Sequence, residues 1–96
     1  QRDLDQEYET ASPTSHIPFI CEDQNLADEI ENKAVHLVEQ YVSNSQISGK
    51  NPAGIAGAGV YLIASGDLTQ RGVADVVGVT KETIRVRVNE IRESSL

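Results

Sequence analysis

The sequence predicts an all-α fold in which about five helices surround one central, apolar helix. Residues 26–41 repeat apolar side chains at helical spacing. Residues 52–64 are almost all small or apolar, which is typical of a helix buried on every side. No stretch alternates apolar and polar residues between hairpin turns, as half-buried strands do. The length of 96 residues suits one domain.

The chain opens with an acidic segment and then a helix start. Residues 1–11 hold four acids and one base without apolar periodicity, which predicts a flexible tail or linker before a domain over residues 12–96. Ser12 and Pro13 predict a hydroxyl N-cap followed by proline at the first helical position. Pro18 predicts that the helix opened here is short or bent.

The next helix is amphipathic and carries apolar residues from Leu26 to Tyr41 on its inner face. We expect it to have about 18 residues and to be followed by a polar loop over residues 43–50. Its outer face carries acids: Asp28, Glu29, Glu31 and Glu39.

Asn51 and Pro52 repeat the cap-then-proline pattern and predict the start of the central helix, which runs to about Ala64. Each glycine inside this helix costs up to about 1 kcal/mol relative to alanine. We expect close approach of neighbouring helix backbones to offset that cost. The glycines concerned are Gly54, Gly57 and Gly59.

The last quarter of the chain, about residues 69–93, has the layout of a helix-turn-helix. Ala74 is small where the two helices cross, Gly78 can adopt the left-handed conformation that ends the first helix, and Thr80 can cap the second. Such a pattern predicts DNA binding by the second helix, but a purely structural helical hairpin can show it too.

The charge distribution bears on this choice. The formal net charge of −7 argues against a nucleic-acid partner, because phosphate binding requires lysine and arginine. Residues 1–49, however, carry two bases and ten acids, whereas residues 50–96 carry six bases and five acids. The second half is therefore the half expected to face an anionic partner, unless the asymmetry is only uneven solvated charge.

Arg85 is the best candidate for reading a base, because arginine can bond O6 and N7 of guanine together. The alternative is a surface ion pair of Arg85 with Glu82 or Asp75. Glu82 can accept a hydrogen bond from cytosine, and Thr83 can contact a thymine methyl. Phosphate contacts, with ordinary solvated surface as the alternative, are predicted for Lys50, Arg71, Thr80, Lys81 and Arg87.

Catalytic, metal and cofactor sites are not predicted. The spacing of His16, Cys21 and His36 fits no structural zinc pattern, and Cys21 is expected to be a small buried residue. The glycines of the central helix follow no strand and do not form a phosphate loop. We therefore expect no enzyme, no cofactor and no metal.

Membrane association is not predicted either. The longest apolar stretch, residues 55–64, is far shorter than the roughly 20 residues of a membrane-spanning helix. The chain does not open like a signal peptide, and its single cysteine fits a reducing cytosol. A cytoplasmic location is the expectation.

Three motifs together resemble the second cyclin-like repeat of archaeal transcription initiation factor B, the counterpart of eukaryotic transcription factor IIB. Residues 52–61 read Pro-Ala-Gly-Ile-Ala-x-Ala-x-x-Tyr, residues 69–71 read Thr-Gln-Arg, and residues 79–85 read Val-Thr-x-x-Thr-Ile-Arg. The resemblance covers roughly residues 12–93.

The resemblance implies a five-helix cyclin-like box whose last two helices form the helix-turn-helix. It implies that the recognition helix reads the B recognition element, a purine-rich stretch upstream of the TATA box, in the major groove of promoter double-stranded DNA. Glu82, Thr83 and Arg85 fall at base-contacting places, and Lys50 falls where the family approaches the DNA backbone. The implied partners are the TATA-binding protein and, through the intact factor, RNA polymerase; a monomer is expected.

The sequence also departs from the family pattern. Gly57 and Gly59 replace usual alanines, which predicts a looser central helix, and Gly72 leaves the capping box of Thr69 incomplete. A zinc ribbon and a first repeat are missing, so we expect a fragment of a longer factor. The acid-rich, lysine-poor composition suggests a halophilic source. The alternative function is a cyclin-box adaptor that binds proteins and uses its helix-turn-helix only structurally.

Overall fold

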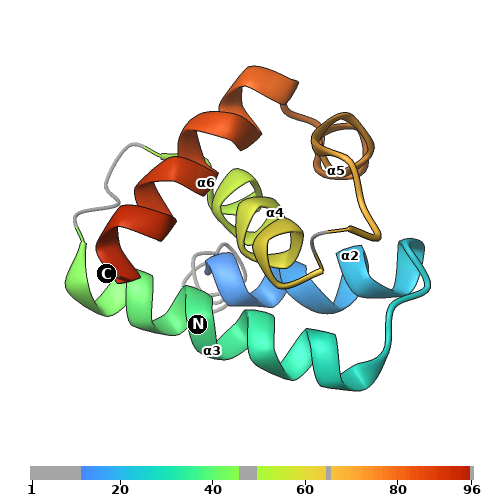
Figure 1. The fold of residues 1–96 in the computed structure, drawn as a ribbon, viewed down its shortest axis with the longest axis horizontal. Coiled ribbons are helices and arrows are strands. Elements are labelled where there is room, and N and C mark those ends of the chain that lie inside the picture. The colour runs from blue at the N-terminus through green and yellow to red at the C-terminus, as the bar shows by residue number, and fades with distance from the viewer. Residues whose placement is uncertain (1–11, 46–49, 65, 96) are drawn as a thin grey trace, which may run out of the picture.

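The computed structural model describes residues 12–45, 50–64 and 66–95, and no strand occurs within these ranges. The predicted all-α fold with five α-helices is confirmed, with a short 3-10 helix before them (Figure 1). The predicted tail over residues 1–11 lies outside the described residues. In chain order the elements are η1 (Pro13–His16), α2 (Ile17–Asp23), α3 (Asp28–Asn44), α4 (Pro52–Ile63), α5 (Gln70–Val77) and α6 (Lys81–Ser95).

The first helical segment begins at Pro13, as predicted, but its first turn is 3-10 and becomes α-helical only at Ile17. Ser12 does not cap it through its side chain; the Ser12 carbonyl oxygen instead accepts from the Ser15 amide at 3.0 Å. Pro18 lies in the first turn of α2, where a missing N–H costs little. The expectation of a short helix is confirmed, because α2 has seven residues.

Helix α3 has 17 residues and starts at Asp28, after Ala27 in extended conformation. It therefore begins two residues after Leu26, which packs against the core from the preceding turn. Acidic residues in the first turn of α3 lie at the positive end of the helix dipole, which they stabilise. The inner face buries Ala34, Val38 and Tyr41.

Helix α4 is the centre of the domain and contacts η1 and each of the other four α-helices. Figure 1 shows it nearly end-on, with α3 along one side and α5 and α6 on the other. Asn51 caps it as predicted: its Oδ1 accepts from the Ala53 amide at 2.8 Å. Residues 54–60 are buried without exception, so the predicted central position is confirmed.

The glycines of α4 make room for side chains of the neighbouring helices. A Cβ added at Gly59 would lie 2.4 Å from Val38 Cγ2, and one added at Gly57 would lie 2.9 Å from Val73 Cγ1. At Gly59 the Ala34 carbonyl oxygen of α3 also lies 4.0 Å from the added Cβ, so a neighbouring backbone approaches there as predicted, while the nearest atoms at both positions belong to valine side chains. These side chains occupy the space an alanine methyl would take, so the glycines do not leave gaps that loosen the helix.

Candidate nucleic-acid interface

Helix α5 begins with a side-chain cap and ends in a tight turn, as expected for the first helix of the predicted helix-turn-helix. Thr69 caps α5, with its Oγ1 accepting from the Gly72 amide at 3.0 Å. Because residue 72 is glycine, no carboxylate completes the capping box. Gly78 ends the helix in left-handed conformation, at φ 78°, and its amide donates to the Ala74 carbonyl at 2.9 Å. The predicted turn is confirmed.

Helix α6 is capped by Thr80, whose Oγ1 accepts from the Thr83 amide at 3.1 Å. The hydroxyls of Thr80 and Thr83 lie 2.9 Å apart. The inner face of α6 anchors it against α4 and α5 and leaves the opposite face in solvent. The buried residues that hold the two-helix unit to the body are Val73, Ala74, Ile84, Val88 and Ile91.

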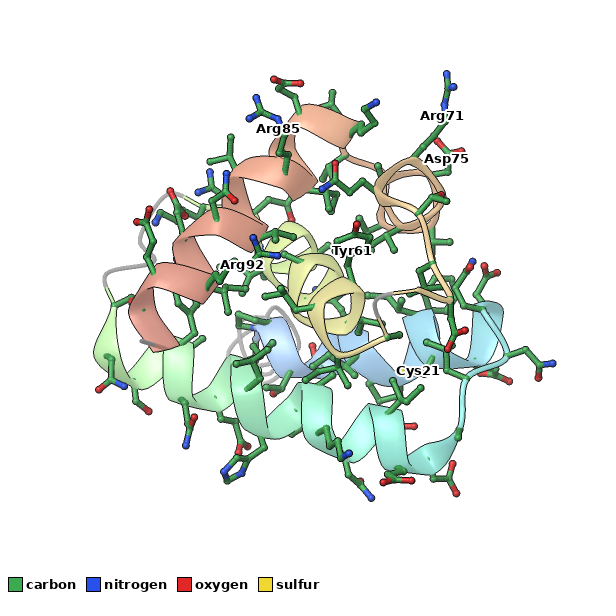
Figure 2. All side chains as sticks on the ribbon, in the orientation of Figure 1. Cys21, Tyr61, Arg71, Asp75, Arg85 and Arg92 are labelled. Atoms are coloured by element: carbon green, nitrogen blue, oxygen red, sulfur yellow. The ribbon has the colours of Figure 1, made fainter. Side chains whose placement is uncertain are left out.

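Two of the three predicted base readers, Glu82 and Arg85, lie on the solvent face of α6. Thr83 is half-buried, and its Cγ2 faces Gly54 of α4. Arg85 is half-exposed and forms an ion pair with Glu82, one helical turn earlier. Of the two acids considered as partners, Glu82 is therefore the one it meets. Asp75 lies on α5 beside Arg71, and Figure 2 shows Arg71 and Arg85 directed outward from the same end of the molecule.

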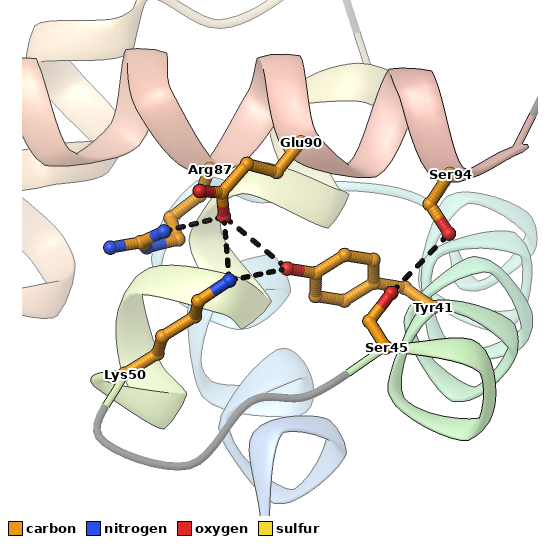
Figure 3. Close-up of polar contacts among 6 residues, drawn as sticks. All are labelled: Tyr41, Ser45, Lys50, Arg87, Glu90 and Ser94. Atoms are coloured by element: carbon orange, nitrogen blue, oxygen red, sulfur yellow. Dashed lines mark hydrogen bonds and ion pairs between the residues drawn. The ribbon is translucent and has the colours of Figure 1, made fainter.

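The residues predicted to contact phosphate fall into two groups. Arg71, Thr80 and Lys81 are exposed, and within the described ranges neither Arg71 nor Lys81 has an ion-pair partner. Lys50 and Arg87 are instead held on one flank of α6 by Glu90 (Figure 3). Arg71 and Lys81 are therefore open to an anionic partner, whereas the hydroxyl of Thr80 already caps α6 and the second group is already paired.

Lys50 and Arg87 form a cluster with Glu90 and Tyr41, two residues that were not identified from the sequence. The spacing of Arg87 and Glu90, three residues apart on a helix, was a visible signal. Tyr41 reaches Glu90 from α3, 49 residues away in the chain, and nothing in the local sequence predicts that contact. Hydrogen bonds to Glu90 and Tyr41 raise the pKa of Lys50. Burial raises the pKa of Glu90, but hydrogen bonds from Arg87 and Lys50 outweigh it and leave the pKa below its ordinary value.

Cys21 is buried at 2% exposure, as predicted. Burial and, secondarily, the charge of Glu31 raise the pKa of its thiol, which favours the neutral form. The described part of the chain contains no group of three or more His, Cys, Asp or Glu residues placed to hold a metal ion. No helix within it is long and apolar enough to cross a membrane.

Comparison with known proteins connects this geometry to a family. Residues 6–94 match the family model described as the transcription factor TFIIB repeat. The chain belongs to this family. The matched TFIIB repeat starts within the segment predicted as a tail and runs from before η1 to one residue short of the end of α6.

Archaeal relatives of the TFIIB repeat are similar along most of the chain. Transcription initiation factor IIB of Methanosarcina mazei is 41% identical over 85 residues, which cover 85% of this chain and 25% of the relative. The factor of Methanothrix thermoacetophila is 36% identical over 95 residues, which cover 96% of this chain and 28% of that relative. Transcription initiation factor IIB 7 of Halobacterium salinarum is 36% identical over 92 residues, which cover 93% of this chain and 28% of that relative. The chain thus spans about a quarter of the length of these relatives.

Proposed function

We propose that this chain is the promoter-binding second repeat of an archaeal general transcription initiation factor, a non-enzymatic protein. The observation that carries the proposal is the helix-turn-helix of α5 and α6, which leaves the N-terminal part of α6 exposed with Lys81, Glu82 and Arg85 on it. A recognition helix presents its N-terminal residues to base edges in this way. The relatives named transcription initiation factor IIB support a role in transcription initiation.

The choice of the second repeat rests on the motifs at residues 52–61 and 79–85, which match that repeat of the archaeal factor. In this proposal α6 enters the major groove at the B recognition element. Glu82, Thr83 and Arg85 then contact bases, and the phosphate contacts come from Lys50, Arg71, Thr80, Lys81 and Arg87.

Reading a base requires Arg85 to leave Glu82. The side chains of Arg85 and Glu82 are 51% and 67% exposed, and an exposed ion pair contributes about 0–1 kcal/mol. A bidentate contact of arginine with guanine is worth about 1–3 kcal/mol of discrimination. The exchange is therefore favourable.

A partner is needed to hold the domain on DNA, because its net charge of −7 opposes binding. We propose that the TATA-binding protein supplies this hold and that RNA polymerase is engaged only through the intact factor. The repeat itself acts as a monomer in the cytoplasm.

The test is an anisotropy titration of this chain onto a labelled duplex that carries a TATA box and an upstream purine-rich element. The TATA-binding protein is present throughout, and a duplex with the upstream element scrambled is the control. We expect a ternary complex that is tighter on the intact element. No gain from the chain at any salt concentration would refute DNA binding and favour the protein-adaptor role.

A further inference from the structure

Four side chains meet on one flank of α6, and a single oxygen is at the centre of their contacts. Glu90 Oε1 accepts from Lys50 Nζ at 3.1 Å, from Tyr41 Oη at 3.3 Å and from Arg87 Nη1 (Figure 3). Lys50 Nζ also donates to Tyr41 Oη at 3.3 Å. The cluster therefore joins α3, the residue before the Asn51 cap of α4, and α6.

The ionised side chains of this cluster are partly withdrawn from water. Exposure is 25% for Lys50, 19% for Arg87 and 34% for Glu90. Charges in such surroundings interact more strongly than charges in bulk water. The carboxylate is shared by two cations, so the cluster presents about one positive charge to its surroundings, not two.

We propose that Glu90 is a positioning residue that holds Lys50 and Arg87 on one flank of the recognition helix α6 and limits the DNA affinity of the domain by cancelling one of their two charges. This inference rests on the proposed DNA-binding function. Each positive charge that neutralises a phosphate releases counterions, so the number of effective charges sets the salt dependence of binding. Glu90 thus lowers sequence-independent attraction without touching a base.

The first test is Glu90→Gln, measured by the same titration across salt concentrations. Glutamine keeps an acceptor oxygen for the cluster and removes the charge. The slope of log affinity against log salt should steepen by about 0.9, which is one added phosphate contact. Binding should tighten by up to about eightfold at 0.1 M salt and by nothing near 1 M, on intact and scrambled elements alike.

The matched control is Glu93→Gln. Glu93 is exposed on the same helix and has no ion-pair partner in the described ranges, so the substitution removes the same formal charge and releases no cation. Its slope should stay close to that of the unmodified chain. An unchanged slope for Glu90→Gln, a slope equal to that of Glu93→Gln, or weaker binding would overturn the inference.

A second pair of variants tests the same charge balance from the side of the cations. Lys50→Gln should reduce the slope by about 0.9, and adding Glu90→Gln to it should restore the original slope, because Arg87 then stands alone with one charge. Failure of the double variant to restore the slope would show that the carboxylate does not limit binding. Absence of salt-dependent binding by the unmodified chain would instead refute the proposed function itself.

Discussion

Replacing Gly59 by alanine should destabilise the domain, although alanine is the better helix former. The added Cβ would lie 2.4 Å from Val38 Cγ2, a distance that real carbon atoms do not adopt. Val38 is fully buried and β-branched, so it has little freedom to rotate away. Helix α3 would have to move from α4, or the valine would have to leave its rotamer.

The magnitude follows from two opposing effects. Gly59→Ala gains about 1 kcal/mol of helix propensity. Overpacking a tight core costs about 1–3 kcal/mol, and a contact this short belongs at the upper end. The expected net loss is about 1–2 kcal/mol. In a domain of this size that lowers the melting temperature by roughly 4–16 °C.

The assay is thermal and urea unfolding followed by far-ultraviolet circular dichroism. Gly54→Ala is the matched control in the same helix, because its Cβ would lie 3.4 Å from Thr83 Cγ2, an ordinary contact. That variant should gain up to about 1 kcal/mol. Val38→Ala removes the obstructing methyl groups. The free energy of unfolding that Val38→Ala loses should therefore be about 1–2 kcal/mol smaller when residue 59 is already alanine.

A melting temperature of Gly59→Ala at or above that of the unmodified chain would refute the reasoning. Strict additivity of Gly59→Ala and Val38→Ala would refute it as well, since the two side chains would then not compete for one space.

Three other predictions concern the interface and its supports. Arg85→Ala should cost about 1–3 kcal/mol of binding and relax base preference, whereas Lys81→Ala should weaken all sequences alike; equal losses on intact and scrambled elements would remove Arg85 from the base readers. Gly78→Ala places a Cβ at φ 78° and should cost about 1–2 kcal/mol of unfolding free energy, which urea titration measures; no loss would mean that the turn tolerates a side chain there. The lowered pKa of Glu90 stabilises the fold above the ordinary carboxyl pKa, and this contribution is lost as the pH falls through the folded-state value. Between pH 6 and about pH 3 the melting temperature should therefore fall more steeply for the unmodified chain than for Glu90→Gln. An equal fall in both would show that Glu90 adds no acid sensitivity.

Most of the fold could be predicted because its signals are local. The Asn51 cap, the left-handed Gly78 and the Thr80 cap each act within a few residues, and the structure shows all three in place. Helix starts were less predictable where competing local geometry intervened. Leu26 fits the helical periodicity, yet Asn25, with its positive φ of 59°, and the extended Ala27 delay α3 to Asp28.

The candidate site divides in the same way. The exposed positions on α6 follow from helical periodicity, and so does the spacing that pairs Arg85 with Glu82. Lys50 and Arg87 look like free cations in the sequence, because the carboxylate they share and the tyrosine that joins them come together only when α3, α4 and α6 pack.

The sequence by itself determined the all-α class, the central helix and the helix-turn-helix, because caps, turns and apolar periodicity depend on neighbouring residues. The tertiary structure alone decided which atoms require Gly59 and which of the predicted phosphate-contacting cations are paired with Glu90. Those outcomes depend on distances between helices: a valine methyl from α3 occupies the space beside Gly59, and one carboxylate on α6 engages two of the predicted phosphate ligands.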